Sequence, residues 1–512
     1  MDRSSEPTGA SAGSSEPGIG STPGDGATPY AGGGAHEHRW LILAVIGIAQ
    51  LMVVLDATIV NIALPSAQQD LGFSDGNRQW IVTAYALAFG SLLLLGGRIA
   101  DLVGRKTVFI AGLIGFAVAS ALGGAAPSFG VLVFARALQG LFGALLAPAA
   151  LSLLTTTFTD PRERAKAFGI YGAIAGAGGA VGLLLGGILT EYLDWRWCLY
   201  VNLLFAVVAI VGGMRLLHGG RPKDRPELDV PGTALVTVGL FCIVYGFSNA
   251  ESHHWSSFLT WGFLVIGVLL LTAFTWWEMR APHPLLPLRV VLDRDRGASY
   301  LAMFLSGAGM FGVFLFLTYY LQQILAYSPV ITGVAFLPMV ACMVFSSVVT
   351  TNYLVPMLGP KPIVPLGMAL TAGGMAWLTA LDLHSTYAAH VLPPLLLAGI
   401  GLGLIFATAM NLATAGVETH DAGVASAMVN TSQQVGGSIG TALLNSLATS
   451  AATNYLKGKQ PSPLTQAEAS MESYSTAFWW SALFFAIGFV VTLVLYRPGV
   501  PKSAATDGAV HM

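Results

Sequence analysis

The sequence has very little charge. Only 10% of its 512 residues are Asp, Glu, Lys or Arg, against roughly 25% in a soluble globular protein. Hydrophobic residues make up 54% of the chain, and the mean hydropathy is +0.68. This composition excludes an ordinary soluble domain and predicts a polytopic membrane protein. The net charge of -2 gives no reason to expect a nucleic-acid partner.

The sequence also lacks the patterns that support catalysis or a cofactor. There is no phosphate-binding loop that ends in Gly-Lys, so we do not expect ATP to drive this chain. The histidines do not cluster with metal-ligand spacing. The three cysteines lie singly in apolar runs, where they are expected to pack as small core residues: Cys198, Cys242 and Cys342. We therefore expect no enzyme activity, no metal and no cofactor.

Long apolar runs are abundant. A run of about 20 apolar residues is long enough to cross the membrane as a helix. Fourteen such runs are predicted, and the fold class is an all-α membrane protein: 40–63, 80–97, 107–124, 130–157, 166–190, 197–217, 230–249, 259–279, 298–320, 332–356, 362–381, 391–413, 422–448 and 476–496. Residues 1–38 are rich in Gly, Ser and Pro and are predicted to be a disordered cytoplasmic tail.

The distribution of basic residues predicts the orientation. If the N-terminus is inside, most of the 24 Lys and Arg residues lie on the cytoplasmic side. The exceptions are Arg78, Arg196, Lys457 and Lys459 on the outer side and Arg136 within span 4. Because basic residues are retained in cytoplasmic loops, both termini are expected in the cytoplasm. The chain is accordingly predicted to be a multi-pass protein of the plasma membrane.

An internal repeat predicts two parallel halves. Gln68-Gln69 and Leu71 recur as Gln322-Gln323 and Leu325, an offset of 254 residues, and Gly104 and Lys106 match Gly359 and Lys361 at 255. Parallel six-helix halves of this kind occur in one large transporter class, with the substrate between them. The predicted division is 1–38 tail, 39–218 first half, 219–293 linker with spans 7 and 8, 294–497 second half and 498–512 tail.

Asp56 and Arg136 are the one acid and the one base that lie well inside a predicted span. At 1.5 Å per residue, Asp56 is about 13 Å and Arg136 about 10 Å from the outer ends of their helices. Opposite charges at similar depth can form a pair, which offsets the free-energy cost of burying each of them. Burial favours a neutral carboxyl group and a guanidinium favours an ionised one, so the two residues are candidates for binding and releasing a proton. The alternative is a structural pair that fixes helix packing.

Two glycine-containing segments are candidates for a conformational gate. The loop after span 2 contains Gly97, Asp101, Gly104 and Arg105, which either lock the cytoplasmic side by charge or simply form a positively charged hairpin. Span 5 has eight glycines in nineteen residues, which permit close helix packing and motion between halves. These glycines are Gly169, Gly172, Gly176, Gly178, Gly179, Gly182, Gly186 and Gly187.

Polar, aromatic and Met side chains on otherwise apolar spans are candidates for a substrate cavity. They suit an adaptable pocket, although each could instead be a helix-packing group. The candidates are Asn61, Tyr85, Gln139, Met310, Phe311, Tyr319, Gln322, Asn411, Asn430 and Gln434.

Four motifs resemble those of the fourteen-span drug:proton antiporters of the major facilitator superfamily, and the resemblance covers roughly residues 40–496. Residues 55–65 are similar to the span 1 signature, and 97–106 to the loop motif of the whole superfamily. Arg136-Ala137-Leu138-Gln139-Gly140 is similar to the span 4 motif, and Trp195-Arg196-Trp197 with Asn202 to the start of span 6.

The resemblance implies export of hydrophobic or amphipathic compounds, such as antibiotics and biocides, against proton entry. It implies that Asp56 and Arg136 manage the proton and that Asp101 and Arg105 stabilise the outward-facing state. Two residues depart from the family pattern: Leu183 replaces the proline of the span 5 antiporter motif, and Leu102 replaces a frequent basic residue. Leu183 leaves the direction of coupling open.

The function expected is therefore proton-coupled efflux by alternating access, powered by the proton gradient without a cofactor. Uptake of an organic solute by symport is the alternative, and a membrane-embedded enzyme or receptor is a third possibility. The expected partners are a small-molecule substrate, protons and the lipid bilayer, and a monomer is expected to be functional.

Overall fold

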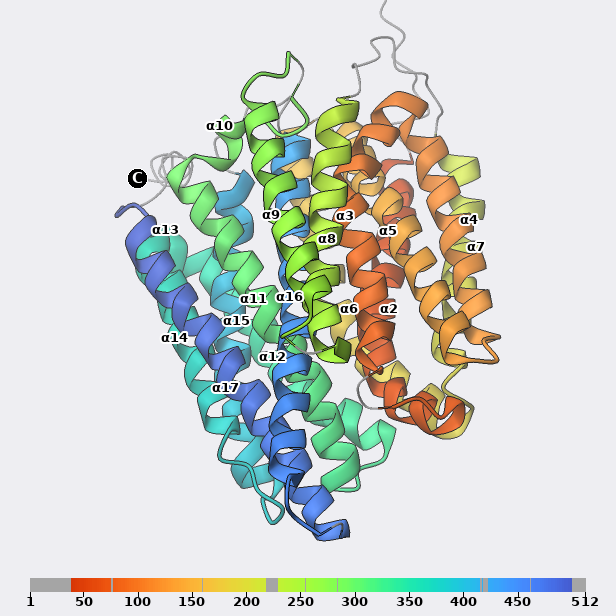
Figure 1. Ribbon diagram of the computed structural model, residues 1–512. Helices are drawn as coiled ribbons and strands as arrows, with labels where there is room; N and C mark the ends of the chain where they lie inside the picture. The colour runs from red at the N-terminus through yellow and green to blue at the C-terminus, as the bar shows by residue number, and fades with distance from the viewer. Residues whose placement is uncertain are drawn as a thin grey trace, which may run out of the picture.

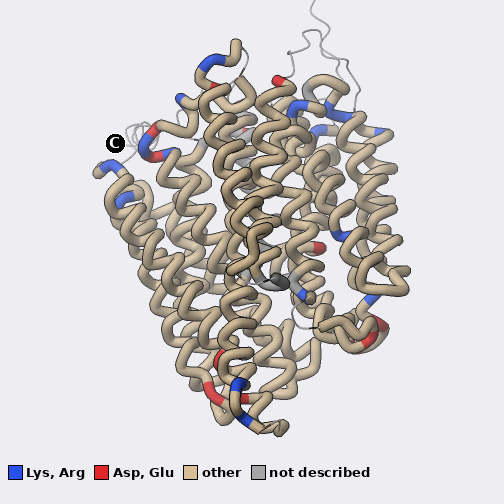
Figure 2. The backbone as a smooth tube through the Cα atoms, viewed as in Figure 1, with Lys and Arg blue, Asp and Glu red and all other residues tan. Residues whose placement is uncertain are grey.

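Helices form all the regular structure in the described part of the chain. The computed structural model describes residues 38–74, 77–158, 160–217, 229–253, 255–282, 284–414, 417, 422–460 and 462–499. Each regular element in these ranges is a helix, in agreement with the all-α fold expected from the sequence. The helices run side by side between two ends of one bundle (Figure 1). Most Lys and Arg residues gather at one end (Figure 2), which we call the inner end, and the opposite end is the outer end.

The helices of the first half are α2 to α7. Each follows one predicted apolar run and reverses the direction of the helix before it: α2 (Arg39–Leu71), α3 (Gln79–Val103), α4 (Arg105–Gly124), α5 (Phe129–Thr157), α6 (Pro161–Tyr192) and α7 (Trp197–Leu216). The inserted pair is α8 (Val230–His253) and α9 (Phe258–Glu278), after which comes the short α10 (Leu288–Val291).

The helices of the second half include three π-helical segments, η1 to η3. In chain order the elements are α11 (Arg294–Tyr319) with η1 (Tyr320–Ile324), α12 (Pro329–Val349) with η2 (Thr350–Leu354) and α13 (Val355–Leu358), α14 (Pro360–Leu378), η3 (Tyr387–Val391) with α15 (Leu392–Thr414), α16 (Ala422–Leu456) and α17 (Pro463–Leu495).

Eleven helices in the described residues are long and apolar enough to cross a membrane. The three other long helices are α6, α14 and α16. The count of fourteen spans and the cytoplasmic termini stay predictions. Residues 1–37 and 500–512, which hold most of the two predicted tails, lie outside the described residues.

Several helices extend beyond the predicted apolar runs at the outer end. α17 begins at Pro463, thirteen residues before the apolar run, because Ser462 accepts a hydrogen bond from the backbone N–H of Thr465 at 3.0 Å. A Ser cap followed by Pro at the first helical position is a strong start signal. Hydrophobicity alone therefore misses the polar turns that precede the membrane.

The two halves use the same helix pairs. In the first half α2 packs against α6 and α7, and α5 against α3 and α4, while α4 also contacts α7. The second half repeats all five pairs, with α11 on α16 and α17, α15 on α12 and α14, and α14 on α17. The halves meet where α6 packs on α12 and α3 packs on α16, and α8 covers the second of these seams.

The backbone repeats as well. Gly72 after α2 has φ 67°, and Ala326, 254 residues later, has φ 53° and is the one non-glycine residue with positive φ among those described. Gly104 and Gly359 also have positive φ, at 109° and 72°, and each immediately precedes the next helix. The repeat seen in the sequence thus has a counterpart in the turns that join the helices.

Candidate functional site

Asp56 is fully buried on α2, and side chains from two other helices, α5 and α7, donate hydrogen bonds to it. Its Oδ2 accepts a hydrogen bond from Arg136 Nη1 at 2.5 Å. Its Oδ1 accepts from Gln139 Nε2 at 2.9 Å and from Asn202 Nδ2 at 2.7 Å. The two oxygens of the carboxyl group therefore receive three hydrogen bonds, one of them from a positively charged donor.

Arg136 on α5 is only 1% exposed and makes several further contacts. Its Nε donates to the carbonyl of Ile81 at 3.1 Å, and its Nη1 donates to Gln139 Oε1 at 2.9 Å. The guanidinium carbon lies 4.5 Å from the centroid of the Tyr85 ring, a cation–π geometry. The arginine is therefore held in place even apart from Asp56.

Ser120 on α4 completes the group that we call the polar core: Asp56, Ser120, Arg136, Gln139 and Asn202. The Ser120 hydroxyl accepts from Gln139 Nε2 at 2.8 Å and from Asn202 Nδ2 at 3.4 Å. The polar core joins α2, α4, α5 and α7 in the middle of the first half. No pattern in the sequence pointed to Ser120, whereas similar depth along their helices related Asp56 to Arg136.

The structure places three of the predicted cavity residues in the protein interior. Gln139 is completely buried within the polar core, and Tyr85, 3% exposed, packs on Arg136. Asn61 is also 3% exposed and donates to the carbonyl of Ala57 at 3.3 Å. These residues were expected to line a cavity because polarity on an apolar helix does not tell a core group from a cavity group.

The other predicted cavity residues divide into two groups. Met310, Asn430 and Gln434 are half-buried and Asn411 is exposed, on helices α11, α15 and α16 of the second half. Tyr319 is fully buried, with Gln322 next to it at the outer end of α11. The side chains of Phe311 and of the predicted gate residue Asp101 lie outside the described residues.

Tyr319 and Gln322 take part in contacts between the halves that we call the outer seal. The Tyr319 hydroxyl donates to Gln68 Oε1 at 2.7 Å, and Gln322 Nε2 donates to the carbonyl of Ile62 at 3.3 Å. The guanidinium of Arg78 lies 4.0 Å from the Tyr319 ring centroid. These contacts close the outer end where α2 meets α11.

The predicted gate segment, residues 97–106, comprises the end of α3, Gly104 and the start of α4, and it is joined to neighbouring segments at the inner end. Gly97 is half-buried there and Gly104 turns the chain with φ 109°. Lys106 donates to the carbonyl of Met214 at 3.1 Å and to that of Leu217, at the end of α7. Arg98 donates to the carbonyl of Pro284 at 3.0 Å. Arg105, half-buried, is the first residue of α4, so the predicted gate segment holds basic groups at the inner end.

The glycines of α6 permit close contacts with two other helices. A methyl group at Gly182 would collide with Thr58 on α2, and one at Gly186 would come within 2.8 Å of Ile59. At Gly187 it would come within 2.6 Å of the Pro329 carbonyl oxygen on α12. α6 is helical through Leu183, the residue that replaces the family's proline. Gly169, Gly172 and Gly176 lie on α6, but their surroundings are outside what the structure describes.

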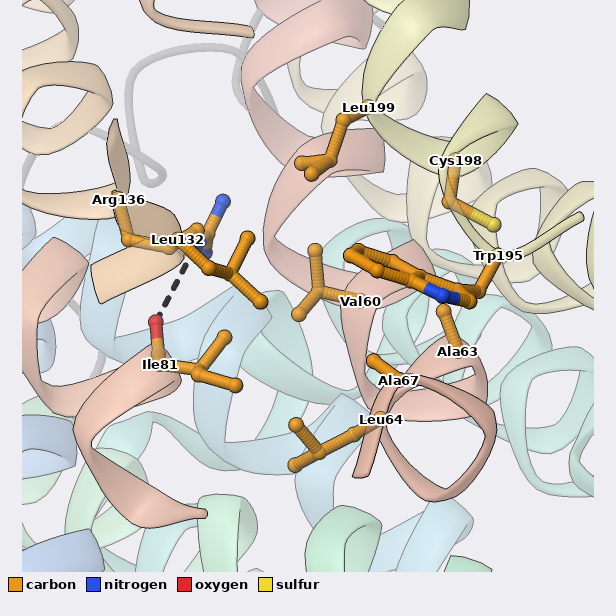
Figure 3. Close-up of a pocket in the computed structure, with 10 residues that line it drawn as sticks. All are labelled: Val60, Ala63, Leu64, Ala67, Ile81, Leu132, Arg136, Trp195, Cys198 and Leu199. Atoms are coloured by element: carbon orange, nitrogen blue, oxygen red, sulfur yellow. Dashed lines mark hydrogen bonds between the residues drawn. The ribbon is translucent and has the colours of Figure 1, made fainter. Parts of the chain in front are cut away.

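A small cavity adjoins the polar core on its outer side (Figure 3). Arg136 and Leu132 border one side and Trp195 and Cys198 the other, with Val60 between them. The space of about 10 Å³ is at the lower limit for a single water molecule. This cavity is far too small for a drug-sized ligand, and apart from Arg136 the residues around it are mainly apolar.

The sequence matches known transporters over most of its length. Residues 46–441 match the pattern of the Major Facilitator Superfamily. A puromycin resistance protein from Streptomyces alboniger is 51% identical over 465 residues, which cover 90% of this chain and 91% of that protein. A cephamycin export protein from Amycolatopsis lactamdurans is 37% identical over 467 residues, covering 91% of this chain and 93% of that protein.

Solved structures show the same fold at low sequence identity. A bacterial homologue of the human lysosomal transporter Spinster, in an inward-facing and unoccupied conformation, superposes with a TM-score of 0.60 at 15% identity. The match covers 90% of this chain and 99% of that one. At this identity the similarity supports the fold alone.

Proposed function

Because the chain belongs to the Major Facilitator Superfamily, we propose that it exports hydrophobic or amphipathic small molecules, antibiotics among them, in exchange for protons. It is a multi-pass transporter of the plasma membrane and not an enzyme. The names of its antibiotic-resistance and export relatives favour export over uptake and make puromycin the first compound to test.

The buried ion pair between Asp56 and Arg136 is the observation that carries proton coupling. A charged carboxyl group inside a span is expensive, and such residues commonly mark proton or ion sites. Here the charge is balanced by Arg136 at 2.5 Å. Binding of a proton to Asp56 would remove the negative charge and leave Arg136 with Ile81, Gln139 and Tyr85 as its partners.

Protonation of Asp56 can affect the outer seal because both involve α2. The ion pair joins α2 to α5, so neutralising it weakens the contact between these helices. Further along α2, Ile62 and Gln68 accept the hydrogen bonds from Gln322 and Tyr319 of the second half. A proton on Asp56 therefore biases the equilibrium between closed and open outer ends, as differential binding requires.

The second half supplies the substrate surface in this proposal. Met310 on α11 and Asn430 and Gln434 on α16 offer thioether and uncharged polar groups on helices that contact the first half, and Asn411 on α15 adds an exposed amide. Adaptable apolar pockets with a few polar groups suit varied amphipathic molecules. The proton gradient is the energy source, no cofactor is required, and a monomer is the functional unit.

Uptake by symport is the competing direction, and one vesicle experiment separates the two. Inside-out vesicles are energised with an acid interior, and puromycin is added while internal pH and drug are followed. An exporter exchanges internal protons for external drug, so the drug accumulates and the gradient falls. Drug addition that leaves the gradient unchanged across a panel of antibiotics, dyes and quaternary ammonium compounds contradicts the proposal.

Asp56→Asn should abolish this exchange by removing the proton-binding carboxyl group while keeping a polar side chain of similar size. The matched control is Asp70→Asn, a change of the same kind on the same helix, at a carboxyl group 46% exposed at the outer end. In vesicles that contain Asp70→Asn, drug uptake should still lower the proton gradient, as in the wild type. Undiminished coupled exchange in Asp56→Asn would remove Asp56 from the mechanism.

A further inference from the structure

Two buried carboxyl groups meet at the inner end of the inserted helices. Asp229 immediately precedes α8 and is 7% exposed, and Glu278 ends α9 and is 4% exposed. Because α8 and α9 are antiparallel neighbours, the start of one lies beside the end of the other. Acidic residues this deeply buried are rare unless they are paired.

One oxygen of each carboxyl group has well-defined donors. Asp229 Oδ1 caps α8 by accepting from the backbone N–H of Gly232 at 2.9 Å, and it also accepts from Trp277 Nε1 at 2.7 Å. Glu278 Oε2 accepts from the backbone N–H of Leu286 at 3.0 Å. Helix capping and loop anchoring thus account for half of the oxygens.

The other two oxygens face each other. Asp229 Oδ2 and Glu278 Oε1 are buried and receive no hydrogen bond from a donor in the described residues. A Cβ at Gly232 would collide with Asp229 Oδ2 and lie 2.8 Å from Glu278 Oε1, so both oxygens border the same small space, and glycine is what allows them to occupy it.

No cation balances this pair in the part of the chain that the structure describes. Arg98 on α3 donates to the carbonyl of Pro284, and Arg280 after α9 donates to that of Trp276 at 3.4 Å. The basic residues Arg221, Lys223, Arg225 and His283, which are near the pair in the sequence, lie outside the described residues. Two carboxylates so close in a poorly solvated site repel each other, and a shared proton converts the repulsion into a hydrogen bond.

We propose that Asp229 and Glu278 form a second proton-binding site, in which one proton is held between Asp229 Oδ2 and Glu278 Oε1 and is exchanged with the inner side. The atoms next to these oxygens favour a proton over a metal ion. Hard cations require several oxygen ligands, whereas the remaining contacts of the pair are with N–H donors.

The site is placed to make the seam between the halves sensitive to inner pH. Glu278 holds Leu286, which together with Leu285 packs into an apolar cluster with Leu94 of α3 and Phe274 of α9. Met428 of α16 packs against the same cluster. The neighbouring Pro284 accepts from Arg98 in the predicted gate loop. The bound proton therefore stabilises the inserted helices against α3 and α16.

The direction of the pH effect follows from the repulsion. When the pair loses its proton, the two negative charges repel each other, which pushes Glu278 and the 284–286 segment bound to it away from Asp229 and α8. The docked arrangement consequently binds the proton more tightly than the released one. Acidification of the inner side favours the docked arrangement, and alkalinisation favours release.

Infrared spectroscopy on the full-length protein in lipid nanodiscs tests this directly. The spectrum should contain a protonated-carboxyl band that disappears as the pH rises, and Glu278→Gln and Asp229→Asn should each remove the same band. The two variants are separate tests, so if one of them does not fold, the other still tests the proposal. The matched control is Glu163→Gln, at an inner-end carboxyl group that is paired with Arg39 at 2.7 Å and should not contribute to the band.

Hydrogen exchange at the backbone amide of Leu286 gives a second readout. Its protection factor should fall about tenfold or more as the band disappears in the wild type, and should stay constant in Glu278→Gln, whose amide donates to Asp229 at every pH. Neither readout requires a substrate, so the result stands apart from the export proposal. Two outcomes overturn the inference: a band that persists in both variants, or a band that Na⁺ or Mg²⁺ removes at constant pH.

Discussion

The two halves of this protein share their helix pairs but differ in what they bury. In the first half, the space between α2, α4, α5 and α7 contains Asp56, Arg136 and three uncharged polar partners. In the second half, the corresponding helices α11, α14, α15 and α17 bury Phe316, Met368, Phe478 and Phe485. The residue that corresponds to Asp56 at the offset of 254 is Met310.

The difference shows that one scaffold can support two kinds of interior. Ion pairs in the described residues of the second half lie at its inner end, between Arg296 or Arg497 and Asp293 or Asp295, and not in the middle of its helices. Charge inside the bundle is therefore not needed to hold six helices together. Its presence in the first half alone points to a task other than stability.

The largest effect is expected when Arg136→Met leaves Asp56 without its cation. Breaking a buried pair by removing one partner costs about 3–5 kcal/mol. Thermal unfolding of the purified protein in detergent should show a large loss of stability. A change well below 1 kcal/mol would mean that water already solvates Asp56, contrary to its complete burial.

The double variant Asp56→Met/Arg136→Met is the control that sharpens the comparison. It gives the first half an uncharged interior with the residue that the second half has at the repeat position. Replacement of a buried ion pair by apolar residues is often neutral or stabilising, so most of the lost stability should return. Coupled transport should not return. If it did, the polar core would have only a structural role.

A smaller effect, on the contact between the halves, is expected for Gly187→Ala. The new methyl group would lie 2.6 Å from the Pro329 carbonyl oxygen and 2.7 Å from the Val330 Cα. Backbone atoms cannot move aside as a side-chain end can, so α6 and α12 must separate, at a cost of about 1–3 kcal/mol. This strain should favour opening of the outer seal.

Opening of the outer seal can be measured by labelling a single cysteine. Gln68 is replaced by cysteine in a protein from which Cys198, Cys242 and Cys342 have been removed. A membrane-impermeant maleimide added from the outer side should react about tenfold faster in Gly187→Ala. Gly179→Ala on the same helix is the matched control, because nothing lies within 4 Å of its added methyl group. Equal rates in the two variants would show that the α6–α12 contact does not hold the outer seal closed.

The smallest effect concerns the repeated turns. Gly72 and Ala326 occupy equivalent positions with φ 67° and 53°. Alanine in this conformation costs about 1–2 kcal/mol, of which glycine's greater freedom in the unfolded chain offsets about 0.5–1 kcal/mol. Ala326→Gly should therefore stabilise the protein by about half a kcal/mol in thermal unfolding, and Gly72→Ala should destabilise it. The same sign for both changes would contradict the equivalence of the turns.

Local sequence patterns predicted much of the fold. Apolar runs gave the helices and their directions, and the offset of 254 related Gln68 to Gln322, which both belong to the outer seal. The helices extend further than hydrophobicity indicates, as α17 does from Pro463, because capping and polar turns continue a helix outside the membrane.

The site could be predicted only in part. Depth along each helix placed Asp56 and Arg136 at the same level in the membrane. Depth does not tell which neighbouring helix a side chain faces, because that depends on the rotation of the helix about its axis. Gln139 was therefore expected in a cavity, although its spacing of three residues from Arg136 puts both on one helix face. The Asp229–Glu278 pair was missed because residues at helix ends look solvated until the packing of α8 on α9 is known.

The central claim is that Asp56 in the first half carries the exchanged proton. The most direct measurement is proton release when puromycin is added to the detergent-solubilised, weakly buffered protein, followed with a pH indicator at several pH values. Wild type and Asp70→Asn should release protons as the drug binds, whereas Asp56→Asn should bind the drug and release none. Drug-induced proton release from Asp56→Asn equal to that of the wild type would contradict the account.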